Sequence, residues 1–244
     1  MSVTPKQLAW LNFVKISSLP LRRITASGLP DSVASGCIVN YQGRKFVLSV
    51  AHATGEGENW AAEMRHEKGK GTLLHRFGVT NFVAEYNFTT NTQEDVDFSY
   101  SEVQLDFESW FQVLDPSGAI QSEERRAEFD FARHEPNQDE TYAFAGQVQT
   151  EIHAEHQLLV SEMVVYPGLR YERTEGGYHV FRLPVPHPGH EAFQGCSGAP
   201  VLDTQGRIVG LVCSGDIGAN TITAVSLARY GAAVDAHILS GVVA

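Results

Sequence analysis

The sequence predicts an all-β protein with a short helix near each end, and three observations support this. Its 244 residues are 43% hydrophobic and include 22 glycines, the composition of a globular domain with a sizeable core. Short apolar or alternating runs follow one another between turn residues through most of the chain. Helical periodicity is confined to residues 5–14 and 226–243. The same composition excludes disorder, collagen and coiled coil.

Each element is predicted from its local pattern. Residues 5–14 predict a short N-terminal helix, because apolar side chains recur there at helical spacing. Two apolar runs on either side of Gln42 and Gly43 predict a hairpin over residues 36–50. A second hairpin is predicted around Gly206. Further strands are predicted at residues 141–148, 157–166, 178–185 and 221–226, and a C-terminal helix at residues 226–243.

The predicted elements fall into two strand-rich halves. A polar, charged stretch at residues 116–140 separates them and is interpreted as a connector. We therefore expect an N-terminal extension over residues 1–25, a first β-barrel over residues 26–115, a second over residues 141–225 and a C-terminal helix over residues 226–244. Two antiparallel β-barrels with a site between them fit this layout.

The composition also limits the partners. The chain has 18 Lys and Arg against 29 Asp and Glu, and this net charge of -11 opposes binding to nucleic acid or anionic membranes. It contains no apolar run of about 18 residues and no secretory signal pattern. Three cysteines, Cys37, Cys196 and Cys213, are too few for a disulfide framework. We therefore expect a cytoplasmic protein that binds neither nucleic acid nor membranes.

Ser197 is the first candidate for chemistry, because it lies in a turn between Gly195 and Gly198. A hydroxyl in such a turn can project outward while neighbouring backbone N–H groups point at one spot. That is the arrangement of a nucleophile with its own oxyanion hole. An ordinary turn explains the same residues equally well, so the rest of the chain must decide.

His52 and Asp97 supply the groups that a serine nucleophile needs. His52 ends the apolar strand that begins at Phe46, and Asp97 lies in an acidic segment at the start of an alternating strand. Alone, each residue is more simply structural, since turns favour aspartate and a lone histidine is usually part of the fold. Together with Ser197 they provide an acid, a base and a nucleophile in the order His, Asp, Ser.

At these positions the sequence resembles the chymotrypsin-like (trypsin-like) serine peptidases. The resemblance is carried by SVAHA, EDVDFSYSEV, GCSGAPVLDTQGRIVGLVCSG and TAVSLARYGAAV, and it spans residues 35–238. It implies two antiparallel β-barrels of chymotrypsin-like type, with His52 as general base, Asp97 as the acid that orients it and Ser197 as nucleophile. It also implies that neither a cofactor nor a metal is needed.

The resemblance further implies how a substrate is held. The backbone N–H groups of Gly195 and Ser197 would form the oxyanion hole. Cys213, Ser214 and Gly215 would lie on the strand that hydrogen-bonds the substrate backbone as an added β-strand.

Glu191 matches the position at the base of the family's specificity pocket. A carboxylate there would favour Lys or Arg side chains by charge pairing. The alternative, slightly preferred because the loop lengths are not aligned, is that Glu191 faces water in a polar loop.

Several residues depart from the family pattern or compete for its roles. Cys196 stands where members activated by cleavage have an acid, so we expect no zymogen cleavage. Cys213 replaces a serine that supports the acid, and a thiol is a weaker donor. Asp95 competes with Asp97, but choosing it would put a charge at a small buried position. Cys196 also competes as nucleophile, as in related viral proteases, although the family frame puts the reactive atom directly before Gly198.

Three other functions fit the sequence less well. A zinc site at His187, His190 and Glu191, or at His153 and His156, lacks the HExxH pattern and a full ligand set. An α/β-hydrolase would need Gly-x-Ser-x-Gly, and the second residue after the serine is alanine. The main alternative is a chymotrypsin-like fold kept as an inactive or latent binding and regulatory module, although no triad member is lost.

The sequence thus predicts a serine endopeptidase that hydrolyses peptide bonds through an acyl-enzyme intermediate. Its partners would be protein or peptide substrates and a regulatory protein, because a protease inside a cell calls for narrow or partner-regulated specificity. Residues 54–94 and 115–140 are the candidate docking surfaces.

Overall fold

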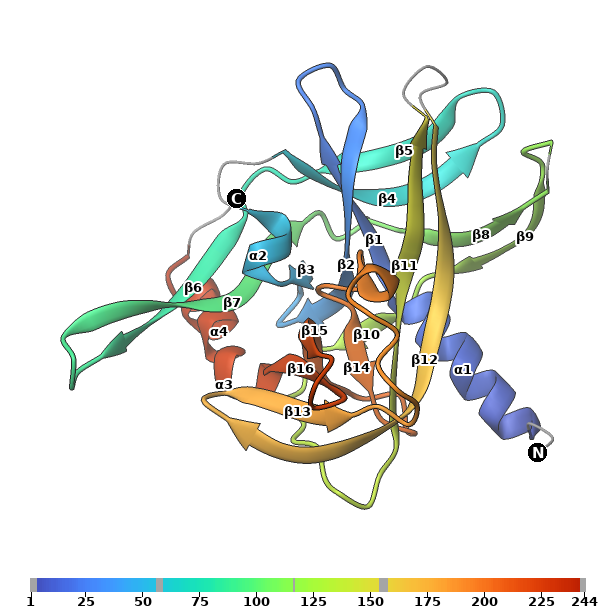
Figure 1. The fold of residues 1–244 in the computed structure, drawn as a ribbon. Helices are drawn as coiled ribbons and strands as arrows, with labels where there is room; N and C mark the ends of the chain where they lie inside the picture. Colours follow the sequence, from blue (N-terminus) through green and yellow to red (C-terminus); the bar gives the residue numbers. More distant parts are fainter. Residues whose placement is uncertain (1–3, 56–58, 116, 154–157, 242–244) are drawn as a thin grey trace.

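The computed structural model describes residues 4–55, 59–115, 117–153 and 158–241. These residues form mostly β-strands, with helices near both ends of the chain (Figure 1). This confirms the fold class predicted from the sequence. None of the helices in these ranges is long and apolar enough to cross a membrane.

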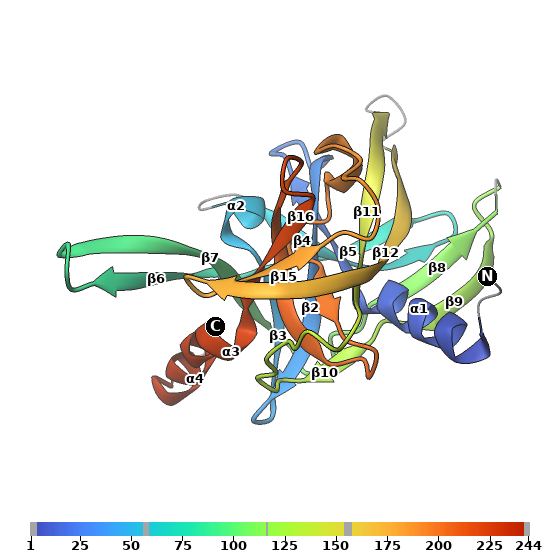
Figure 2. The ribbon, with the colours of Figure 1, turned by 60° about the horizontal axis from the view of Figure 1, so that its bottom comes forward.

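Helix α1 (Pro5–Ser17) is the predicted N-terminal helix and continues beyond residue 14. A capping box starts it, because the side chain of Thr4 accepts from the Gln7 N–H while the Gln7 side chain accepts from the Thr4 N–H. The Trp10 indole N–H donates to the backbone oxygen of Asp203 at 2.7 Å. The helix is thereby attached to the second half of the chain, and Figure 2 shows it lying next to β8 and β9.

The first half, predicted as the first β-barrel, forms a curled sheet. Its strand order is β5-β4-β1-β2-β3-β7-β6, and β10 pairs in parallel with β2. The β6–β7 hairpin extends away from the rest of the molecule in both views (Figure 1, Figure 2). The strands are β1 (Leu19–Ile24), β2 (Pro30–Tyr41), β3 (Arg44–Ser49), β4 (Trp60–Glu67), β5 (Gly71–Arg76), β6 (Asn81–Asn87), β7 (Thr92–Val103) and β10 (Glu128–Asp130).

Strand β1 lies inside the predicted N-terminal extension, residues 1–25, so the sheet begins earlier than expected. Leu19 and Leu21 are fully buried, and Arg22 is buried with its guanidinium 2.8 Å from Glu63. Charged residues are almost never buried unless paired. Because the partner is far away in the sequence, the local pattern does not indicate a buried strand there.

The predicted hairpin over residues 36–50 is confirmed as β2–β3. Tyr41 pairs with Arg44 across the turn. Gln42 has φ 50° and Gly43 has φ 76°, as a two-residue turn of type I′ requires. This hairpin carries the chain to His52 in the short helix α2 (Ala51–Thr54).

The predicted connector, residues 116–140, holds two strands that the sequence analysis did not identify. One is β9 (Ile120–Arg125), which pairs with β8 (Trp110–Leu114) as a separate two-stranded sheet, and the other is β10. Every residue of β9 is exposed, so the strand has no apolar face for a sequence pattern to reveal.

The second half forms a closed barrel in the order β11-β12-β13-β16-β15-β14. The β14–β15 hairpin around Gly206 is confirmed. The strand predicted at residues 157–166 begins at Gln157, outside the described residues, and β12 continues well past 166. The barrel strands are β11 (Tyr142–His153), β12 (Leu158–Glu175), β13 (Tyr178–Arg182), β14 (Pro200–Leu202), β15 (Ile208–Asp216) and β16 (Thr221–Ser226).

One hydrophobic core joins the two halves. Phe46 and Phe98 of the curled sheet belong to the same buried cluster as Leu202 and Leu211 of the barrel. The chain then ends in two helices, α3 (Leu227–Tyr230) and α4 (Ala232–Leu239), where one was predicted. They meet at Gly231, where a Cβ would lie 2.7 Å from the Phe131 ring. The shared core holds the facing edges of the two halves in a fixed relation.

Candidate active site

His52 and Asp97 are brought together by neighbouring strands of the curled sheet. Strand β3 leads into α2 and His52, while β7 carries Asp97, and the two strands pair through Ser49 and Ser99. The Asp97 carboxylate makes two contacts with His52. Its Oδ1 accepts from the His52 backbone N–H at 2.9 Å, and its Oδ2 lies 2.8 Å from the ring Nδ1. Asp97 therefore holds His52 at two points, its backbone N–H and its ring Nδ1.

Ser197 comes from the other half of the chain. It lies in the loop between the 3-10 helix η2 (Glu191–Phe193) and β14, with its Oγ 3.0 Å from His52 Nε2. The imidazole is 49% exposed, so its far side faces the solvent. A hydrogen-bonded chain thus runs from Asp97 through His52 to Ser197, across the boundary between the two halves.

The Ser197 loop is fastened to β2 by Ser35. The Ser35 N–H donates to the backbone oxygen of Ser197 at 2.8 Å, and the Ser35 hydroxyl donates to that of Gly195 at 2.8 Å. Gly198 has φ +86°, and a Cβ on it would lie 2.0 Å from the Ser35 oxygen. Only glycine fits at residue 198. Ser35 was not identified from the sequence, and no local signal points to a serine 160 residues away.

Asp97 stays ionised in a partly buried place. Burial alone would raise its pKa, but hydrogen bonds from the His52 ring and backbone, the charge of His52 and a contact with Cys213 together hold that pKa below its ordinary value. The Asp97 backbone N–H donates to the Tyr178 hydroxyl at 3.0 Å. Tyr178 is a second positioning residue that the sequence analysis did not identify.

Cys213 lies next to Asp97, where the resemblance expects a serine. Its thiol donates to the backbone oxygen of Leu211 at 3.4 Å. Burial, and then the negative charge of Asp97, raise the pKa of Cys213 well above its ordinary value. The group beside the carboxylate is therefore a neutral thiol.

The positions of Cys196 and Asp95 decide whether they compete with Ser197 as nucleophile and with Asp97 as the acid. Cys196 is fully buried, a Cβ on Gly146 would lie 2.5 Å from its Sγ, and burial raises its pKa to about 12. Such a thiol stays protonated and is a poor nucleophile. Asp95 is exposed and pairs with Ala84 in the β6–β7 hairpin. The carboxylate beside His52 is that of Asp97.

The backbone around Ser197 presents two donors. Within the described chain, the N–H groups of Gly195 and Ser197 donate to no other group, whereas those of Cys196, Gly198 and Ala199 all donate to backbone oxygens. Gly195 adopts φ +95°. Its conformation leaves these two N–H groups free to bind an oxygen anion.

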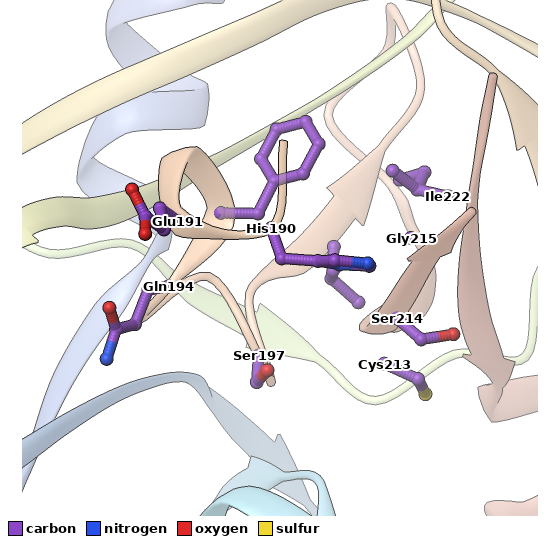
Figure 3. A pocket seen from close by; sticks show the side chains of 10 residues that line it. His190, Glu191, Gln194, Ser197, Cys213, Ser214, Gly215 and Ile222 are labelled. Atoms are coloured by element: carbon purple, nitrogen blue, oxygen red, sulfur yellow. The ribbon is translucent and has the colours of Figure 1, made fainter. Parts of the chain in front are cut away.

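A cavity of about 400 Å³ opens beside Ser197 (Figure 3). Among the strand pairings of the described residues, Ser214 and Gly215 pair with β16 on one side and with no strand on the other. This edge can add a further strand. The cavity is lined by His190, Glu191, Phe193, Gln194, Ser197, Val212, Cys213, Ser214, Gly215 and Ile222.

Glu191 is at the rim of this cavity and is exposed. Figure 3 shows its carboxylate on the opposite side of η2 from Ser214 and Gly215, while the His190 ring extends toward them. The carboxylate therefore lies outside the pocket and faces water, the alternative that the sequence analysis slightly preferred. Glu191 begins the short helix η2, a turn that the spacing of residues in the sequence does not reveal.

The described residues contain no group of three or more His, Cys, Asp or Glu side chains placed to hold a metal ion. The rings of His187 and His190 lie 5.7 Å apart. His156, which was weighed with His153 as a ligand pair, lies outside the described residues.

Solved structures of other proteins have a similar fold. A serine endoprotease of Yersinia pestis is similar with a TM-score of 0.58 and 13% identity, over 99% of this chain and 69% of its own. Mouse neuropsin, a serine protease, is similar with a TM-score of 0.58 and 11% identity, over 92% of this chain and 96% of its own. The fold is chymotrypsin-like.

The active form of the M. tuberculosis protease Rv3671c has the same chymotrypsin-like fold, with a TM-score of 0.52, 14% identity and coverage of 96% of this chain and 87% of its own. No protein-family model matches the chain. No curated protein matches it in sequence either. The fold implied by the sequence resemblance is thus confirmed by structure, at identities too low to carry residue roles from one protein to another.

Proposed function

We propose that the protein is a serine endopeptidase that hydrolyses peptide bonds through an acyl-enzyme intermediate. The observation that carries this proposal is the hydrogen-bonded chain Asp97–His52–Ser197 beside an unpaired strand edge. The proteins with similar structures include serine proteases by name. A substrate peptide adds to the edge at Ser214 and Gly215, which places its carbonyl carbon next to Ser197.

In the first half of the reaction, His52 Nε2 takes the proton of Ser197 as the hydroxyl oxygen attacks the carbonyl carbon. Negative charge develops on the carbonyl oxygen, and the N–H groups of Gly195 and Ser197 bind it. Asp97 holds the Nδ1 hydrogen and stabilises the imidazolium. When the C–N bond breaks, His52 returns the proton to the leaving amine and the acyl group remains on Ser197.

In the second half, His52 removes a proton from water, which attacks the acyl carbon. The tetrahedral intermediate collapses, His52 returns the proton to Ser197, and the acid product leaves. The half-exposed side of the imidazole gives that water access. The cycle consumes one water for each peptide bond.

The test is hydrolysis of a heat-denatured protein mixture, with new N-termini identified by mass spectrometry. We expect the unmodified protein to generate a defined set of new N-termini and Ser197→Ala to generate none. Ser122→Ala is the matched control, since Ser122 is exposed on β9 outside the site. Absence of new N-termini from a folded protein, or their persistence in Ser197→Ala, would count against a serine endopeptidase.

A further inference from the structure

The strand that carries Asp97 is irregular at that residue. One step along β6 corresponds there to three steps along β7, so Asp97 and Phe98 pair with no residue of β6 among the described strands. This is a β-bulge, and bulges beside functional sites re-aim a side chain while leaving backbone groups unpaired. The carboxylate of Asp97 reaches His52 from this bulge. Its aim therefore depends on what fixes the bulge in place.

The Tyr178 hydroxyl takes the place of the missing strand partner. It accepts from the Asp97 backbone N–H at 3.0 Å, and it comes from β13, a strand of the barrel in the other half of the chain. Burial raises the pKa of Tyr178 above its ordinary value, so the hydroxyl stays neutral. A backbone N–H in a partly buried place needs an acceptor. The position of the bulge therefore depends on the position of Tyr178.

Tyr178 is itself held by Tyr230 of α3. The two rings pack with centroids 6.2 Å apart. The Tyr230 hydroxyl also donates to the backbone oxygen of Gly176, two residues before Tyr178, at 3.1 Å. A Cβ on Gly177 would lie 2.4 Å from the same hydroxyl, so the turn before β13 lies directly against it. Tyr230 is buried and thus fixes both the ring of Tyr178 and the start of its strand.

Tyr230 also contacts the β6–β7 hairpin, at Glu85 on β6. Its hydroxyl lies 3.3 Å from Glu85 Oε2, and burial, followed by the charge of Glu85, raises the pKa of Tyr230 to about 12, so the hydroxyl keeps its hydrogen. The Arg229 guanidinium donates to Glu85 Oε1 through Nε at 3.0 Å and Nη2 at 2.9 Å. In both views the base of the hairpin lies next to α3 (Figure 1, Figure 2). The hairpin that carries Asp97 is therefore fastened at a second point.

We propose that Tyr230 and Glu85 are positioning residues for the orienting acid, acting through Tyr178. The pair fixes the turn from which Tyr178 starts, and Tyr178 fixes the bulge that aims Asp97 at His52. The inference rests on the proposed function. Neither tyrosine nor Glu85 lines the substrate cavity, so they act on the chemical step and not on substrate binding. A misplacement of about 1 Å at a catalytic group lowers a rate by up to about 100-fold.

The experiment measures kcat and KM for one fluorogenic peptide in the unmodified protein, Tyr178→Phe, Tyr230→Phe and the double variant, with thermal unfolding recorded for each. We expect Tyr178→Phe to lower kcat by about tenfold and Tyr230→Phe by about threefold, with KM within about twofold, because each removes one hydrogen-bonding hydroxyl. The double variant should stay within about 1.5-fold of Tyr178→Phe, since Tyr230 acts through Tyr178.

Matched controls come from the same elements. Tyr171→Phe removes the hydroxyl of a partly buried barrel tyrosine that bonds Thr174 instead of the hairpin, and kcat should stay within about 1.5-fold. Glu85→Ala should lower kcat by about threefold, as Tyr230→Phe does, because both remove the same contact. Glu94→Ala should leave kcat unchanged, since Glu94 lies opposite Glu85 on the hairpin and its carboxylate accepts from Asn87.

The outcomes separate this inference from the proposed function. In an active protein, the inference is overturned if Tyr178→Phe keeps its kcat, if the losses in Tyr178→Phe and Tyr230→Phe multiply, or if KM changes in place of kcat. Equal losses in Glu85→Ala and Glu94→Ala would overturn it as well. Each of these results leaves the endopeptidase proposal intact. An unmodified protein that cleaves no peptide and does not react with a serine-directed probe refutes the proposed function, and the positioning role with it.

Discussion

The substitution Asp97→Asn gives the sharpest prediction about the proposed mechanism, because the geometry around His52 dictates its effect. Asp97 Oδ1 accepts from the His52 backbone N–H, which can only donate. An asparagine has one carbonyl oxygen, and that oxygen must take this place. Its amide NH2 then faces Nδ1 at the 2.8 Å position now held by Oδ2, and donates to it.

The consequence is a change of tautomer. With Nδ1 acting as acceptor, the ring hydrogen moves to Nε2, which lies 3.0 Å from Ser197 Oγ and can no longer accept its proton. Losing the base in this way in a serine protease lowers kcat by about 10⁴-fold, or about 5 kcal/mol of transition-state stabilisation. KM should change little, because Asp97 does not line the substrate cavity.

The assay is steady-state hydrolysis of one fluorogenic peptide by the unmodified protein, Asp97→Asn and Asp95→Asn, with thermal unfolding recorded for each. Asp95 is the matched control, an exposed aspartate two residues earlier on the same strand. We expect Asp95→Asn to stay within about twofold of the unmodified protein, as an exposed charge outside the site should. The reasoning would be refuted if folded Asp97→Asn kept more than a tenth of the activity, or if Asp95→Asn lost as much.

Three further predictions concern the supports of the site and the barrel. Gly198→Ala should lower the free energy of unfolding in urea by at least about 2 kcal/mol, because residue 198 has a positive φ and its new Cβ would clash with the Ser35 backbone oxygen. Gly43 also has a positive φ but lies in open space, so Gly43→Ala should lower that free energy by only about 1 kcal/mol. Equal losses in the two variants would contradict this. Cys213→Ser should raise kcat/KM by about fivefold, because a hydroxyl beside Asp97 is a better hydrogen-bond donor to it than the thiol, which also donates to the Leu211 oxygen; an unchanged or lower kcat/KM would contradict this. Burial lowers the pKa of His179 from 6.5 to about 4. Between these two pH values the unfolded chain binds a proton that the folded chain does not, so the free energy of unfolding should fall by about 3 kcal/mol as pH drops from about 6.5 to 4. His179→Gln should show a correspondingly smaller fall, and the same dependence of unfolding free energy on pH as in the unmodified protein would count against this.

The site residues that could be predicted from the sequence are those that lie in a recognisable local pattern. His52, Asp97 and Ser197 each follow or begin a recognisable strand or turn, so their approximate places could be predicted. The distances between them depend on the shared core of the two halves, to which Phe98 and Leu211 belong. That packing comes from residues far apart in the chain, and local patterns do not encode it.

The missed features have the same physical origin. Arg22 is tolerated in a buried strand only because Glu63 pairs with it, and Tyr178 reaches Asp97 from β13, a strand of the barrel in the other half of the chain. For Glu191 the sequence analysis weighed two places and slightly preferred the water-facing one; the spacing to Ser197 does not reveal the helical turn η2 on which Figure 3 shows the side chain. Contacts of this kind appear only when the chain is assembled in three dimensions.

The central claim is that Ser197 is an activated nucleophile, and reaction with a fluorophosphonate probe tests it most directly. Such a probe phosphonylates an activated serine, with loss of fluoride, and leaves ordinary serines unmodified. We predict one adduct by intact mass, mapped to Ser197, absent from Ser197→Ala and His52→Ala, and retained in Cys196→Ala. No adduct on the folded protein, or an adduct that persists in Ser197→Ala, would contradict the claim.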